Sequence, residues 1–185
     1  MLLAFTLALL LFVLPTRVAH ATDQRLVLND FVLDNTEGQL ILRFGVSVTD
    51  RETLQLLLKD GGKVSLLCEG SLIRPSTLWL DTTLARQQTT STLFYDVLTK
   101  DYVLTDDMGT PLGRTPNLGK LLETTWEAQS LNVGLLSQLT RGGSYRVDLS
   151  IQIKDENVPL WMTKTLFFWS WNVAPSMRYS MDFTF

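Results

Sequence analysis

The chain has 185 residues, of which 45% are hydrophobic, and a formal net charge of −3 at pH 7. This weak negative charge, without any strongly basic stretch, argues against nucleic acid and anionic lipid as partners. The single cysteine, Cys68, excludes an internal disulfide. Because Cys68 shares a predicted strand face with Val64 and Leu66, we expect a buried and inert thiol.

The N-terminal segment predicts a secretory signal peptide over residues 1–21. Its apolar run, MLLAFTLALLLFVL, is shorter than the about 20 residues that a membrane-spanning helix needs. Ala19-His20-Ala21 then places small residues at the two positions that a signal peptidase recognises. We expect cleavage after Ala21 and a periplasmic protein without an integral membrane span. A retained N-terminal anchor is the alternative.

The residue inventory argues against catalysis. The only histidine, His20, lies inside the predicted signal peptide. Residues 22–185 therefore have no imidazole, which excludes Ser-His-Asp and Cys-His catalysis and nearly all zinc sites. The sequence also has no phosphate loop, nucleophile elbow or Ser-x-x-Lys motif. We expect a protein that is not an enzyme and binds neither a metal nor a cofactor.

Residues 22–185 predict a single domain that begins with a β-hairpin and a helix. RLVLNDFVLD and GQLILRFGVSVT alternate apolar and polar residues around a turn at Asn35–Gly38. The next segment changes to helical spacing, with a cap at Thr49 or Asp50 and an end at Gly61. Its apolar face consists of Leu54, Leu57 and Leu58.

The middle of the chain predicts four more strands. Residues 64–74 and 77–87 flank a break at Arg74-Pro75-Ser76, and residues 89–99 and 100–107 follow as a second hairpin. Asp106–Gly109 indicates a turn. A calcium loop would instead need acidic or amide ligands at regular spacing and a distal Glu.

A second helix is predicted in TPNLGKLLETTWEAQS. Thr115 is a candidate N-cap, and Pro116 fits the first helical position. The apolar stripe of this helix consists of Leu118, Leu122 and Trp126. NVGLLSQLTRGG then leads to SYRVDLSIQIK, the most regular interior strand. The apolar face of that strand consists of Tyr145, Val147, Leu149, Ile151 and Ile153.

The chain ends in RYSMDFTF, which places Tyr179, Met181, Phe183 and Phe185 on one strand face. A terminal Phe resembles the closing strand of an outer-membrane β-barrel, so a small barrel is one alternative. The two helices and the irregular middle strands favour a half-buried strand in a soluble sandwich. The predicted fold class is mainly β. It is an antiparallel β-sandwich, immunoglobulin-like in architecture, with two short amphipathic helices.

The most aromatic stretch, PLWMTKTLFFWSWN, is the candidate binding region. Trp169 and Trp171 would project to the same side of a strand. Tryptophans anchor protein partners or stack on sugar rings, although a role in the core is the alternative. The candidate binding residues are Trp161, Trp169, Trp171, Asn172, Arg74 and Trp79.

Several features of this chain follow one another in a characteristic order. After the paired N-terminal strands come Arg74-Pro75 and Trp79, then Tyr145, Val158-Pro159-Leu160 and the segment around Trp169-Ser170-Trp171-Asn172. In this order the chain resembles the secreted proteobacterial family called domain of unknown function 4390. The resemblance implies an envelope protein without an assigned activity. Members are often encoded beside a nitrogen-regulation-type sensor histidine kinase, which implies a sensory accessory role.

We therefore expect a non-enzymatic periplasmic module that binds an envelope protein, the sensor domain of a membrane histidine kinase. A protein that stacks envelope carbohydrate on the same tryptophans is the alternative from another class. The small outer-membrane β-barrel is the third hypothesis.

Overall fold

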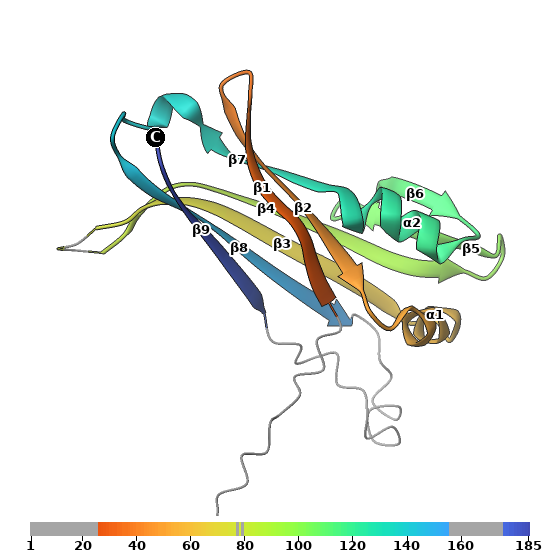
Figure 1. Ribbon diagram of the computed structural model, residues 1–185. Coiled ribbons are helices and arrows are strands. Elements are labelled where there is room, and N and C mark those ends of the chain that lie inside the picture. Colours follow the sequence, from red (N-terminus) through yellow and green to blue (C-terminus); the bar gives the residue numbers. More distant parts are fainter. Residues whose placement is uncertain (1–25, 77, 79, 156–175) are drawn as a thin grey trace, which may run out of the picture.

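The computed structural model describes residues 26–76, 78, 80–155 and 176–185. Two antiparallel sheets lie face to face (Figure 1), with strand orders β1-β2-β7 and β6-β5-β4-β3-β8-β9. The strands are β1 (Leu26–Thr36), β2 (Gln39–Val48), β3 (Lys63–Arg74), β4 (Thr82–Asp96), β5 (Asp101–Asp106), β6 (Pro111–Thr115), β7 (Gln129–Leu135), β8 (Ser144–Asp155) and β9 (Met177–Thr184). The helices are α1 (Arg51–Lys59), α2 (Leu118–Thr124) and two 3₁₀ turns, η1 (Trp126–Ala128) and η2 (Leu136–Gln138). The predicted antiparallel sandwich with two short α-helices is confirmed.

The N-terminal hairpin forms as the alternation predicts. Strands β1 and β2 pair antiparallel from Leu26↔Val48 to Thr36↔Gln39. The turn uses Glu37 and Gly38, both with positive φ, and the Asn35 side chain accepts a hydrogen bond from the Gly38 N–H at 3.1 Å. Positive φ at both central residues is the backbone of the two-residue hairpin turn that suits twisted strands.

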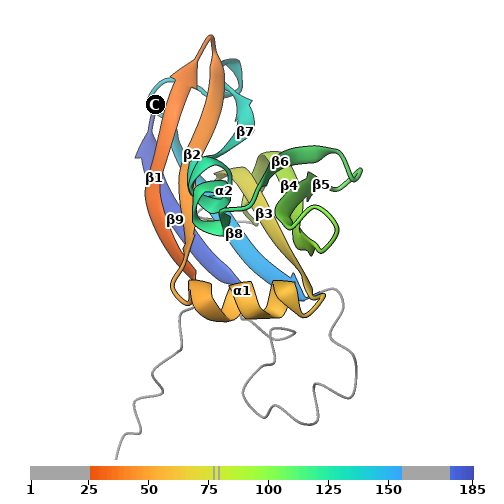
Figure 2. The ribbon, with the colours of Figure 1, turned by 90° about the vertical axis from the view of Figure 1, so that its right-hand side faces the viewer.

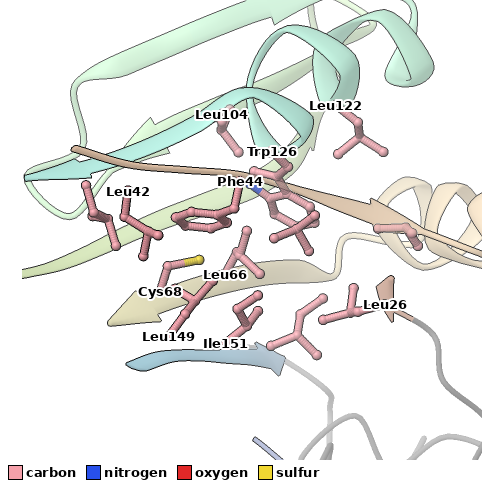
Figure 3. Packing of buried hydrophobic residues seen from close by; sticks show 14 of the residues in the cluster. Leu26, Leu42, Phe44, Leu66, Cys68, Leu104, Leu122, Trp126, Leu149 and Ile151 are labelled. Carbon is pink, nitrogen blue, oxygen red and sulfur yellow. The ribbon is translucent and has the colours of Figure 1, made fainter. Parts of the chain in front are cut away.

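The core lies between β2 and the inner faces of β3 and β8 (Figure 3). The predicted apolar faces of β2 and β8 are all buried, from Leu40 to Val48 and from Tyr145 to Ile153. The two sheets pack tightly at Gly70, where a Cβ atom would lie 2.9 Å from the Val133 side chain on β7. Burial of this apolar area is the main stabilising term of the fold.

Helix α1 closes one end of the sandwich (Figure 2). Asp50 caps it by accepting a hydrogen bond from the Thr53 N–H at 3.1 Å, and Gly61 follows with φ of 88°. Leu54 and Leu58 are fully buried. The sequence predicts this helix and its apolar face correctly, because a capped amphipathic segment gains stability from burying one stripe.

Strand β4 corrects one prediction. The sequence predicts separate strands at 77–87 and 89–99, whereas β4 runs without interruption from Thr82 to Asp96. It pairs with β3 from Thr82 to Phe94 and with β5 from Ser91 to Asp96. The polar stretch Arg86–Thr92, where the two predicted strands met, is held by the ladder of β3.

The segment between β5 and β8 also differs from the prediction. The turn at Asp106–Gly109 is confirmed, but β6 and β7 are strands that the sequence did not predict. The N-cap of α2 is Asn117, whose side chain accepts from the Lys120 N–H at 3.1 Å, and not Thr115. The stripe Leu118, Leu122 and Trp126 is buried as predicted.

Trp126 joins the helical segment to the large sheet. It is fully buried, and its indole N–H donates to the Ser91 hydroxyl of β4 at 2.9 Å. This bond satisfies a donor that would otherwise be buried without a partner. Segment α2–η1 thereby extends the upper layer beyond the small sheet, toward β5 and β6 (Figure 1).

Strand β9 confirms the predicted C-terminal alternation. Tyr179, Met181 and Phe183 are half-buried, and the residues between them are exposed. Phe183 lies against Tyr145, with ring centroids 5.7 Å apart. The strand pairs with β8 in regular register and forms one edge of the large sheet.

Candidate functional site

The loop between β3 and β4 projects beyond the sandwich at the end opposite to α1 (Figure 1). Ion pairs and a hydrogen bond fix the base of this loop, at Ser76 and Asp81. Asp81 accepts from the Ser76 N–H at 3.1 Å and pairs with Arg146 of β8 at 2.7 Å, and Arg146 also pairs with Asp148 at 3.1 Å. The Ser76 N–H, and then the Arg146 guanidinium, hold the pKa of Asp81 below its usual value. The loop therefore leaves the sheet from a fixed point.

Two leucines extend from this loop into solvent. Leu78 and Leu80 are 85% and 92% exposed. Exposed apolar side chains on a projecting loop are candidates for contact with another protein, because binding residues often lie on loops that a rigid scaffold positions. We call Arg74, Leu78 and Leu80 the loop surface.

Arg74 is the one predicted binding residue that the structure describes. It is exposed at the end of β3, and its guanidinium lies over the Tyr145 ring at 5.7 Å and donates to the Gln138 carbonyl at 3.5 Å. The Tyr145 hydroxyl accepts from the Thr140 N–H at 2.8 Å, and this bond, with the nearby guanidinium, lowers the pKa of Tyr145. Through these contacts Arg74 anchors the start of the β3–β4 loop to the end of the sandwich.

The other predicted binding residues lie outside the described residues. These are Trp79, Trp161, Trp169, Trp171 and Asn172. The predicted signal peptide, residues 1–21, lies outside them as well. Whether the tryptophans lie near Arg74 therefore stays a prediction.

A groove of about 290 Å³ lies on the outer face of the large sheet. Its lining includes two arginines, Arg86 and Arg178, and two carboxylates, Glu69 and Asp148, which β3, β4, β8 and β9 supply. Serines fill the spaces between the charges: Ser71, Ser150 and Ser180. Arg86 pairs loosely with Glu69 at 3.6 Å. Such a lining offers hydrogen bonds to a hydroxyl-rich or charged ligand, and its described residues include no aromatic ring for stacking.

The sequence did not indicate this groove, because its residues come from four strands whose order follows from the topology. The sequence predicts a strand over residues 77–87, and this range includes both loop leucines. The exposed position of Leu78 and Leu80 follows from β4 beginning only at Thr82.

Within the described residues, burial is the influence that shifts the pKa of the Cys68 thiol. Cys68 is fully buried on the inner face of β3, and burial raises its pKa to about 12. A thiol held protonated in this way is a poor nucleophile. In the described part of the chain, no group of three or more His, Cys, Asp or Glu side chains is placed to hold a metal ion. Among the same residues, no helix has the length and hydrophobicity needed to cross a membrane.

These features define the class of the protein: a two-sheet antiparallel β domain with a projecting apolar loop and a polar groove. The chain matches the family model described as Domain of unknown function (DUF4390) over residues 23–182. It therefore belongs to this family, as the resemblance predicted. No curated protein and no solved structure matches the chain.

Proposed function

We propose that this protein is a non-enzymatic, protein-binding module of the bacterial periplasm. Its partner is the sensor domain of a membrane histidine kinase, and the loop surface makes the contact. The observation that carries the proposal is the exposure of Leu78 and Leu80, 85% and 92%, on a braced loop. A loop fixed at its base loses less conformational freedom on binding than a free loop would.

Two further features support the periplasmic location and the choice of partner. The apolar N-terminal run followed by Ala19-His20-Ala21 supports export to the periplasm. The family resemblance supports the choice of a sensor histidine kinase as the partner. The loop surface also includes one cation, Arg74, and arginine is enriched at the centre of protein interfaces.

The test is a titration of the purified protein with the isolated sensor domain of a nitrogen-regulation-type histidine kinase from the same bacterium. The double substitution Leu78→Ser and Leu80→Ser is expected to weaken binding at least tenfold. The matched control is Val97→Ser with Leu98→Ser, because these residues are 67% and 95% exposed in the turn at the far end of β4. The control is expected to bind as the wild type does.

Circular dichroism of both variants checks that the fold is intact. Equal affinities for the wild type and the loop variant would remove the loop surface from the interface. If the wild type does not bind the sensor domain at all, the choice of partner is wrong.

Envelope carbohydrate is a second candidate ligand, and the groove on the outer face favours it. Its serine hydroxyls, carboxylates and guanidinium groups match the donors and acceptors of a glycan. A titration with soluble peptidoglycan fragments, followed by NMR, tests this candidate. Ser150→Val removes one hydroxyl from the groove, and Ser130→Val removes one from the outer face of the small sheet. If the glycan binds in the groove, Ser150→Val should weaken glycan binding and Ser130→Val should not. A flat titration of the wild type would reject this candidate.

A further inference from the structure

The edges of the two sheets are not equally protected against pairing with another strand. Strand β1 carries a bulge between Asn29 and Val32, with Asp30 at φ of 52°. Strand β6 has five residues, begins at Pro111 and shifts register against β5. Strand β7 shifts register against β2 near Gly134. Bulges, prolines and short strands are the devices that keep sheet edges from associating.

Strand β9 has none of these devices. Its eight residues include no Pro or Gly, and it pairs with β8 without a register shift. Within the described residues, its other edge has no strand beside it. Charged side chains also protect edges, but β9 carries one of each sign, Arg178 and Asp182, so an edge of this length is a template for a strand with complementary charges.

The hydrogen bonds to β8 show which β9 groups face this open edge. The Phe185 N–H donates to the Gly143 carbonyl at 3.1 Å, toward β8. Backbone groups alternate between the two sides along an antiparallel strand. The groups that face the open edge therefore belong to the residues of the other parity: Arg178, Ser180, Asp182 and Thr184.

The charges on β9 are complementary to those of a second, antiparallel β9. In a pair centred on Ser180, Arg178 of each copy lies opposite Asp182 of the other. Both residues are exposed, and neither has an ion-pair partner in the described part of the chain. Asp182 lies opposite Arg146 of β8, but that guanidinium binds Asp81 and Asp148 instead. A register centred on Asp182 or Arg178 would place like charges against each other.

We propose that two copies of this chain associate through β9, antiparallel about Ser180, so that their six-stranded sheets become continuous. The outward backbone groups of both strands then pair with each other. Two Arg178–Asp182 pairs, related by the two-fold axis, select this register over its neighbours.

A cysteine at the axis tests the register directly. Residues directly opposite each other in a hydrogen-bonded antiparallel pair have Cα atoms about 5.5 Å apart, within the range of a disulfide. Ser180→Cys is therefore expected to give a disulfide-linked dimer on mild oxidation. Thr184→Cys is the matched control, because position 184 would lie opposite Ser176 and not opposite itself. Cys68 is buried and cannot compete.

Charge reversal tests the affinity, measured by sedimentation velocity over a range of protein concentrations. Arg178→Asp or Asp182→Arg is expected to weaken dimerisation about tenfold, because each substitution acts twice in the interface. The double variant Arg178→Asp with Asp182→Arg should restore it. Asp107→Arg makes the same change of charge as Asp182→Arg, but in the β5–β6 turn, and should have no effect.

Three results would overturn the proposal. The first is a wild-type mass that stays monomeric at every concentration. The second is equal cross-linking by the cysteines at 180 and 184. The third is a double charge variant that dimerises no better than the single variants.

Discussion

Strand β3 has an inner side that faces the small sheet and an outer side that faces away from it. The inner side consists of apolar residues such as Leu66, Cys68 and Leu72, all fully or almost fully buried. The outer side carries Glu69 and Ser71, which line the groove. One strand therefore contributes to the core with one set of residues and to a ligand-accessible surface with the alternate set. Substitutions on the two sides should affect different measurements.

The largest loss of stability is expected at Trp126, which packs against the inner side of the large sheet. Trp126→Ala removes a fully buried indole and leaves the Ser91 hydroxyl without its donor. We expect the free energy of unfolding to fall by about 3–5 kcal/mol. Urea denaturation measures it. Trp126→Phe keeps most of the packing, so its loss of stability should be smaller. A loss below about 1 kcal/mol for Trp126→Ala would contradict the burial of this side chain.

A smaller loss of stability is expected at Gly70, where the two sheets pack tightly. Gly70→Val places a branched side chain where a Cβ atom alone would lie 2.9 Å from Val133 and 3.2 Å from Leu131. Overpacking of this kind costs about 1–3 kcal/mol. The matched control on the outer side is Gln88→Val, which lies opposite Glu69 in the exposed part of β4. The control should change the free energy of unfolding by less than about 0.5 kcal/mol.

The inner side of β3 should also give the protein a pH-dependent stability, through Cys68. Burial raises the pKa of this thiol from 9.0 to about 12. The unfolded thiol ionises first, so its contribution to stability is complete below about pH 9 and is lost as the pH rises toward 12. Between those values the wild type should lose up to about 1.4 kcal/mol per pH unit more than Cys68→Ala. Parallel stability curves for the two proteins between pH 8 and pH 10 would contradict this expectation.

Regular alternation made part of this fold predictable from the sequence. In β2, β8 and β9 one side is buried, so the apolar residues follow the period of the strand. Helix α1 was predictable because Asp50, Leu54, Leu58 and Gly61 combine a cap, a stripe and a stop.

The rest of the fold depends on partners that the local sequence does not reveal. Strand β4 carries Gln and Thr on both sides, and β6 and β7 contain Gly113 and Gly134, so none has a clean period. The groove requires the strand order β4-β3-β8-β9, which places residues far apart in the sequence on one surface. Of the predicted binding residues, Arg74 is the one within the described residues, and its contacts with Tyr145 and Gln138 depend on tertiary structure.

The most direct test of the difference between the two sides uses adjacent residues of the same type on β3. Leu66 faces the core and is 1% exposed, whereas Leu67 is half-buried on the outer side. Urea denaturation should show a loss of about 2–5 kcal/mol for Leu66→Ala and of about 1 kcal/mol or less for Leu67→Ala. Equal losses for the two variants, or a greater loss at Leu67, would contradict the assignment of the core to one side of the large sheet.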